Sequence, residues 1–224
     1  MNTGVRATAS SVFGLAVLGL LLFLPAGTLN YWQAWAFIAT TLVATILPTV
    51  YIGRTNPAAL ERRMHAGPKA ETRVVQKVVM VSAFTALIAM LVFSAYDHRM
   101  NWSSVPGWVS VFGDALVAIG LGIAMLVIVQ NAYAAATVTV ESGQTLVSSG
   151  VYKYVRHPMY VGNFIMMIGI PLSLGSYWGL LFVIPGQAVI VFRILDEEKL
   201  LTEQLPGYRE YTQHVRYRLL PYVW

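Results

Sequence analysis

The stretch MYVGNFIMMIGIPLSLGSYWGLLFVIPGQAVIVF, residues 159–192, decides the fold, because 34 residues pass without one charged side chain. A helix needs about 20 apolar residues to cross a bilayer, so the stretch is long for one crossing and short for two full ones. Helix-breaking residues fall inside it at Gly169, Pro171 and Gly175. We therefore expect a tight helical hairpin that turns near Gly175.

Four more apolar stretches lie on the N-terminal side of this hairpin. The chain of 224 residues is 57% hydrophobic and only 11% charged, whereas soluble domains carry about 25% charged residues. So few charges cannot cover a surface that faces water. The fold class we predict is all-α, a polytopic integral membrane helical bundle, with crossings before the hairpin at residues 12–29, 33–52, 78–96 and 108–129.

The connections between the crossings are of two kinds. The turn at Tyr31 is uncharged, and we expect its aromatic residues at the membrane interface; residues 97–101 are expected to form a loop. The connection at residues 54–77, the segment at residues 130–157 and the tail from Arg193 carry most of the Lys and Arg residues. Lys and Arg mark cytoplasmic loops, so we predict six crossings with both termini in the cytoplasm.

Composition also excludes several classes of function. The chain has no cysteine, which excludes disulfides, thiolate metal sites and a cysteine nucleophile. His65, His98 and His214 lack partners at the spacing of metal ligands, so no metal is expected. The net charge of +5 fits the cytoplasmic loops of a membrane protein. We therefore expect membrane lipids as partners and no nucleic acid.

The first candidate site is the segment Arg156-His157-Pro158 at the start of the hairpin. Proline biases the residue before it away from helical geometry and is well placed in the first turn of a helix. Arg156 and His157 then lie at a helix entrance, where free N–H groups favour anions. The plainer alternative is a basic flank that anchors a membrane helix.

The second candidate site is the charged segment from Arg193 to Glu198 at the end of the hairpin. If the helix continues out of the bilayer, Arg193 and Glu197 are four residues apart and share one face. An arginine there can hold a carboxylate with two hydrogen bonds, and a carboxylate can accept bonds from an amine or from ribose hydroxyls. The plainer alternative is an Arg–Glu pair at a solvated helix exit.

Taken together, these segments resemble one known family. The chain resembles the isoprenylcysteine carboxyl methyltransferase family, within the wider group of membrane methyltransferases that includes phospholipid N-methyltransferases. The resemblance covers residues 131–224, after an N-terminal transmembrane part at residues 1–130. Its carriers are Gln144–Val147, Gly150–Tyr152, Arg156–Gly162, Arg193 with Glu197 and Glu198, Leu205–Tyr208 with Tyr211, and Arg216–Pro221.

The resemblance implies a set of site residues and a cofactor. In that family S-adenosylmethionine is the methyl donor, held in a pocket at the cytoplasmic face. The implied cofactor-binding residues are Gln144, Thr145, Leu146, Val147, Tyr152, Arg156, His157, Pro158, Met159, Tyr160 and Glu197. Arg193 is implied to hold an acceptor carboxylate, with Asn131 as a second polar contact and Glu198 as a base where the acceptor carries a proton.

The acceptor stays open at this point. The loops are similar to those of bacterial members, which implies the bacterial inner membrane and a lipophilic small molecule or lipid as acceptor. It can be a carboxylate, a phospholipid amine or a thiol. Two further alternatives are a sterol-type reductase with NADPH and a non-enzymatic transporter or scaffold. Charges gathered at one membrane face favour an enzyme, because transporters place theirs near the bilayer midplane.

Overall fold

The computed structural model describes residues 3–64, 71, 73–134, 138–140 and 143–224. His65 and the other residues between these ranges lie outside the description. The described residues form helices and no strands, which confirms the all-α prediction. The elements are α1 (Thr3–Ala26), α2 (Trp32–Thr55), α3 (Pro57–Met64), α4 (Val74–Met100), α5 (Gly107–Gln130), η1 (Gly150–Lys153), α6 (Pro158–Ser173), η2 (Trp178–Phe182), α7 (Val183–Gln204) and α8 (Tyr208–His214).

Among the described residues, four helical segments are long and apolar enough to cross a membrane. They are Trp32–Thr55, Val74–Met100, Gly107–Gln130 and Trp178–Gln204. Two shorter apolar helices, Phe13–Ala26 and Pro158–Ser173, occupy the positions of the other two predicted crossings. The protein is therefore an integral membrane helical bundle, and the predicted apolar stretches correspond to its helices.

The predicted hairpin is formed by α6, η2 and α7. Pro158 is the first residue of α6, a position where the missing N–H of proline costs nothing and its fixed φ suits a helix. The chain leaves α6 after Ser173 and turns through Gly175, whose φ of +70° is readily adopted by glycine. The N–H of Ser176 then bonds to the carbonyl of Pro171 at 2.8 Å.

The backbones of α5 and α6 approach each other closely at a row of glycines. A Cβ added to Gly120 would lie 2.5 Å from the carbonyl oxygen of Gly162, and one added to Gly162 would lie 2.7 Å from that of Gly120. Gly169 and Gly113 repeat the arrangement one heptad away, where a Cβ on Gly169 would lie 2.8 Å from the carbonyl oxygen of Gly113. Small residues allow this close approach of membrane helices. We call this contact the glycine seam.

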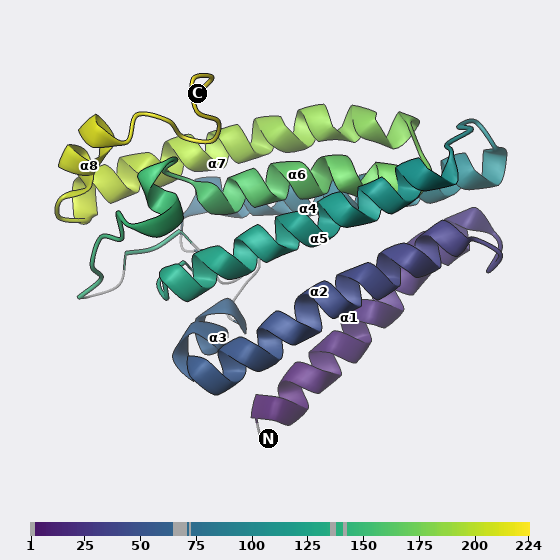
Figure 1. Ribbon diagram of the computed structural model, residues 1–224, viewed down its shortest axis with the longest axis horizontal. Helices are drawn as coiled ribbons and strands as arrows, with labels where there is room; N and C mark the ends of the chain where they lie inside the picture. Colours follow the sequence, from purple (N-terminus) through teal and green to yellow (C-terminus); the bar gives the residue numbers. More distant parts are fainter. Residues whose placement is uncertain (1–2, 65–70, 72, 135–137, 141–142) are drawn as a thin grey trace.

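Figure 1 shows how the elements divide between the two ends of the bundle. The turn between α1 and α2 and the loop between α4 and α5 lie at one end. Helix α3, helix α8 and the segment between α5 and α6 gather at the other. The polar segments far apart in the sequence are thus brought together at one end, as the charge pattern predicts.

The structure corrects two local expectations at the end that holds the short turns. Asp97 does not lie in a loop, because α4 continues to Met100 and Asp97 is fully buried in it. Tyr31 is only 1% exposed, and its hydroxyl donates a hydrogen bond to the carbonyl of Leu174 at 2.5 Å. Both residues bond to partners distant in the sequence, and these long-range contacts override the local preference for a loop or an interface.

Candidate active site

Glu198 of α7 binds three basic side chains at once. Its carboxylate accepts a hydrogen bond from Nε of Arg156 at 2.7 Å and one from Nε of Arg218 at 2.8 Å. Nε2 of His157 lies 3.2 Å from the same carboxylate. We call Arg156, His157, Arg218 and Glu198 the Glu198 cluster. It joins the start of α6, the end of α7 and the C-terminal segment in one charged contact.

The C-terminal segment is also tied to the entrance of α6 through the backbone. The N–H groups of Arg156 and His157 donate to the carbonyls of Tyr217 and Arg218, at 2.9 and 3.0 Å. Nη1 of Arg156 donates to the carbonyls of Val215 and Arg216, both at 2.9 Å. The Arg156 guanidinium was expected to add charge for an anion. The structure shows it bound to a carboxylate and two carbonyls of the protein instead.

A second polar network surrounds Arg193. Its Nε donates to the hydroxyl of Tyr160 at 2.8 Å, and this hydroxyl donates to the carboxylate of Glu197 at 2.6 Å. Arg193 and Glu197, predicted to share a helix face, are thus bridged by a phenol from α6. Nη1 of Arg193 donates to the carboxylate of Glu71 at 3.2 Å and to the side-chain oxygen of Gln76 at 3.0 Å. We call these five residues the Arg193 network.

Glu71 is a partner that the sequence did not reveal. It lies in the basic connection before α4 and is 2% exposed. Its other carboxylate oxygen accepts a hydrogen bond from the N–H of Val138 at 3.3 Å. Nearby, Arg73 pairs with Asp196 of α7 at 2.7 Å. Glu71 and Arg73 therefore contact the charged end of the hairpin. A buried carboxylate such as that of Glu71 is unfavourable without a cationic partner, and Arg193 is that partner.

Asn131 and three tyrosines form a third polar group near the start of the segment after α5. Nδ2 of Asn131 donates to the hydroxyl of Tyr152 at 3.1 Å, and Oδ1 accepts from the N–H of Tyr133 at 3.1 Å. The hydroxyl of Tyr211 donates to the backbone carbonyl of Tyr152 at 2.7 Å. Burial raises the pKa of Tyr152, against the opposing effect of the Asn131 hydrogen bond. This phenol is therefore protonated at neutral pH.

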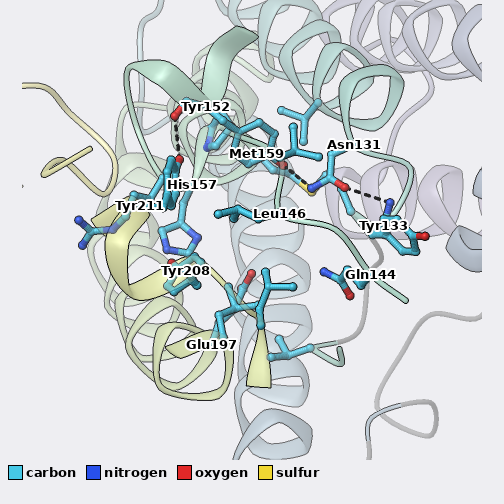
Figure 2. A pocket seen from close by; sticks show the side chains of 18 of the residues that line it. Asn131, Tyr133, Gln144, Leu146, Tyr152, His157, Met159, Glu197, Tyr208 and Tyr211 are labelled. Carbon is cyan, nitrogen blue, oxygen red and sulfur yellow. Dashed lines mark hydrogen bonds between the residues drawn. The ribbon is translucent and has the colours of Figure 1, made fainter. Parts of the chain in front are cut away.

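Residues from each of these groups line one cavity, which is partly open to solvent. Figure 2 shows the side chains of Asn131, Tyr152, His157 and Glu197 around it. Of the predicted site residues, the cavity brings together Asn131, Gln144, Thr145, Leu146, Val147, Tyr152, Arg156, His157, Pro158, Met159, Tyr160, Arg193 and Glu197. Glu198, also a predicted site residue, does not line the cavity and instead binds the basic residues of the Glu198 cluster.

The cavity also has lining residues that were not predicted. They include Tyr208 and Tyr211 of α8 and Leu200, Leu201 and Leu205, which precede it. Leu205, Tyr208 and Tyr211 lie in a segment that carried part of the family resemblance, and this resemblance could have pointed to them. Among the described residues, no group of three or more His, Asp or Glu side chains is placed to hold a metal.

Comparisons with known proteins show what parts of this chain are similar to. Residues 108–207 match the phospholipid methyltransferase family. Over 91 residues, the chain is 33% identical to the Delta(14)-sterol reductase TM7SF2 of Mus musculus, covering 39% of this chain and 22% of the relative. Over 139 residues, it is 25% identical to the nickel-cobalt-cadmium resistance protein NccN of Alcaligenes xylosoxydans xylosoxydans, covering 59% of this chain and 61% of the relative.

The chain thus spans only 22% and 61% of the length of these two relatives. A solved structure of the eukaryotic intramembrane Ras methyltransferase ICMT (isoprenylcysteine carboxyl methyltransferase) aligns with all of this chain and 88% of its own, at 17% identity and a TM-score of 0.48. Every lining residue of the cavity except Tyr208 and Tyr211 lies inside the matched range. The segment that builds most of the cavity, residues 108–207, is similar to the phospholipid methyltransferase family.

Proposed function

We propose that the protein is an S-adenosylmethionine-dependent methyltransferase that acts on a lipophilic acceptor at the membrane. One observation carries the proposal. The stretches that the family resemblance implies as donor-binding, Gln144–Val147, Tyr152, His157–Tyr160 and Glu197, come from four separate parts of the chain and line a single cavity. That cavity lies in the segment that matches a methyltransferase family.

The residues present suit this donor. S-adenosylmethionine, when bound, supplies an electrophilic methyl group on a positively charged sulfur. Glu197 provides a carboxylate and Tyr152 and Tyr160 provide aromatic faces, and both kinds of group attract a cation. Gln144 and Asn131 add further polar groups, and leucine, valine and methionine side chains supply the apolar part of the wall. The cavity therefore offers what a charged, amphiphilic nucleoside requires.

For the acceptor, the proposal assigns the binding of a carboxylate to Arg193. This guanidinium lines the cavity and already binds one carboxylate, that of Glu71. An acceptor that is already an anion needs no base, so the protein has only to align donor and acceptor and exclude water. Asn131 is the second polar contact. Glu198 has a positioning role, because its carboxylate holds the side chains of Arg156 and His157 in the cavity wall.

The proposal extends to the setting of the enzyme. The cavity lies at the end of the bundle where the basic segments gather, and we place that end in the cytoplasm of a bacterial cell, with the helices in the inner membrane. All lining residues except Val127 follow residue 130. We therefore assign the methyltransferase core to residues 131–224 and acceptor selection to the helices of residues 1–130.

A second candidate function has one specific observation in its favour. The mouse relative is a sterol reductase and shares 33% identity over 91 residues with this chain. A reductase would use the same cavity for a nicotinamide nucleotide. NADPH carries phosphate groups, and the two guanidiniums that line the cavity, those of Arg156 and Arg193, are bound to carboxylates of the protein. The methyl donor, which carries no phosphate, suits the cavity better.

Binding of S-adenosylhomocysteine and of NADPH to the purified protein in detergent separates the two candidates. We expect calorimetric binding of the first and none of the second. The reverse result would replace the proposal with the reductase. A screen with methyl-labelled donor over lipophilic carboxylates, phospholipid amines and thiols then identifies the acceptor. Labelling of amines or thiols alone would overturn the role given to Arg193 as a carboxylate clamp.

A further inference from the structure

Two tyrosines on one turn of α8 differ in how their hydroxyls are satisfied. Tyr208 and Tyr211 both line the cavity, and their ring centres lie 5.8 Å apart. The hydroxyl of Tyr211 donates to the carbonyl of Tyr152 at 2.7 Å. The hydroxyl of Tyr208 has no hydrogen-bond partner among the described residues, although the residue is only 3% exposed. The same side chain is thus bonded at one position and unbonded at the other.

An unbonded hydroxyl inside a protein is unfavourable, because it has given up water without gaining a partner. Such groups in native structures call for an explanation, and a ligand is one. Tyr208 faces the cavity beside Glu197 and His157 (Figure 2). Its ring is held by the apolar side chains of Leu146, Leu201 and Leu205. The phenol therefore lies in the wall of the cavity and carries a hydroxyl that no described residue satisfies.

The surroundings of Tyr208 restrict what it can bind. Burial raises its pKa, and the carboxylates of Glu198 and Glu197 raise it further, so the phenol is protonated and can donate. The Arg156 guanidinium acts in the opposite direction, so positive and negative side chains lie on both sides of the phenol and balance one another. The apolar cluster on its other side favours a flat and largely apolar group. A neutral nitrogen or oxygen acceptor on an aromatic nucleoside meets these conditions.

We propose that Tyr208 donates a hydrogen bond to a neutral acceptor atom in the adenosine half of the methyl donor. This inference rests on the proposed function and adds a contact from α8, outside the segment that matches the family. It makes α8 part of the binding site. Donor binding would then also restrain the C-terminal segment, which is joined to α6 through Arg156.

The test uses the full-length protein in detergent and the variant Tyr208→Phe, which keeps the ring and removes the hydroxyl. We expect its Kd for S-adenosylhomocysteine to rise about tenfold, the loss of one hydrogen bond. The Kd for 5′-methylthioadenosine, which lacks the amino-acid half, should rise by a similar factor. The melting temperature of the ligand-free variant should not fall, because no bond within the protein is lost.

Two control variants make the result decisive. Tyr211→Phe removes a hydroxyl that is bonded, so its ligand-free melting temperature should fall by about 2 to 4 °C. Tyr177 does not line the cavity, and its N–H donates to the hydroxyl of Ser103 in the loop between α4 and α5, so Tyr177→Phe should change neither quantity. An unchanged Kd in Tyr208→Phe overturns the inference. So does a raised Kd accompanied by a fall in melting temperature like that of Tyr211→Phe, since that pattern marks a structural role.

The two ligands and the wild-type protein separate the remaining outcomes. A raised Kd for S-adenosylhomocysteine with an unchanged Kd for 5′-methylthioadenosine would place the contact on the amino-acid half and overturn the assignment to adenosine. No binding of either ligand by the wild-type protein would overturn the proposed function and this inference together. Equal binding by the wild-type protein and Tyr208→Phe would overturn the inference alone.

Discussion

The two ends of the bundle both bury acidic residues, but they satisfy them with different partners. At the end without the cavity, the carboxylate of Asp97 accepts hydrogen bonds from the N–H and hydroxyl of Ser103, at 2.8 and 2.6 Å, and from the hydroxyl of Ser176 at 2.5 Å. Beside it, the ring of Tyr31 stacks on His98 with centroids 3.8 Å apart. These bonds join three connections of the bundle with neutral partners.

At the cavity end, the acids are held by long basic side chains and a phenol. Glu198 binds Arg156 and Arg218, and Glu71 binds Arg193. Long side chains can change partners by rotation, whereas the short donors around Asp97 are fixed by the backbone that carries them. From this difference we expect the Asp97 end to contribute mainly to stability, and the cavity end to contribute mainly to the ligand binding proposed above. Each variant below tests one side of this contrast.

The largest effect is expected from Asp97→Ala. The change leaves the hydroxyls of Ser103 and Ser176 and one backbone N–H without an acceptor in a buried site, which should lower the free energy of unfolding by about 3 kcal/mol or more. Denaturant unfolding in detergent measures this loss. The affinity of the folded fraction for S-adenosylhomocysteine should not change. A large change in affinity would show that the two ends are not separate in function.

Arg193→Ala should abolish methyl transfer with little effect on donor binding. The guanidinium is the proposed clamp for the acceptor carboxylate, and losing such a group costs about a hundredfold in turnover. Turnover of methyl-labelled donor and calorimetric titration are measured on the same preparation. Arg73→Ala is the matched control, because Arg73 pairs with Asp196 outside the cavity lining. Loss of donor binding with turnover retained would refute the assigned role.

Glu197→Ala should weaken donor binding. A charge-assisted hydrogen bond to the cationic donor is worth about tenfold or more in Kd. The adjacent Asp196 does not line the cavity, so Asp196→Ala should bind the donor normally. Equal Kd values for wild-type protein and Glu197→Ala in calorimetric titration would remove Glu197 from the donor site.

The smallest effect is expected from Arg218→Ala. Its side chain is 29% exposed and forms one of three contacts with Glu198, so the loss should be about 1 kcal/mol or less. The drop in melting temperature should shrink in high salt, because salt screens an exposed pair. Arg216→Ala, at an exposed neighbour, serves as control. A large drop that does not depend on salt would contradict this and would mean that the Arg218 side chain stabilises the tail by more than its charge, for instance by its contact with the Trp224 ring.

Much of the bundle could be predicted because it depends on local properties. Lengths of uncharged sequence predict helices, and Gly175 with Pro158 predicts where the hairpin turns and begins. The meeting of His157, Tyr160 and Glu197 was predicted because they lie at the two ends of one hairpin. No periodic pattern reports a contact between Arg193 and Glu71, which are 122 residues apart, or between Asp97 and Ser176, which are 79 apart.

The same reasoning explains the residue whose surroundings were misjudged. Arg156 lies at a helix entrance, and its sequence position does favour anions. The sequence does not tell which anion is nearest, and in the folded chain it is Glu198. Tyr208 was missed for a related reason, since a tyrosine in an amphipathic helix usually marks packing. Tyr208 is distinguished from Tyr211 by the structure, in which the Tyr211 hydroxyl has a hydrogen-bond partner and the Tyr208 hydroxyl has none among the described residues.

The glycine seam limits how a molecule dissolved in the bilayer can reach the cavity. With backbones this close at Gly120 and Gly162, no hydrocarbon chain fits between α5 and α6. The lipophilic acceptor of the proposed reaction should therefore enter along another side of the bundle. The close contact also joins the helix that ends before Asn131 to the helix that begins after His157, so one rigid contact links the two sides of the cavity wall.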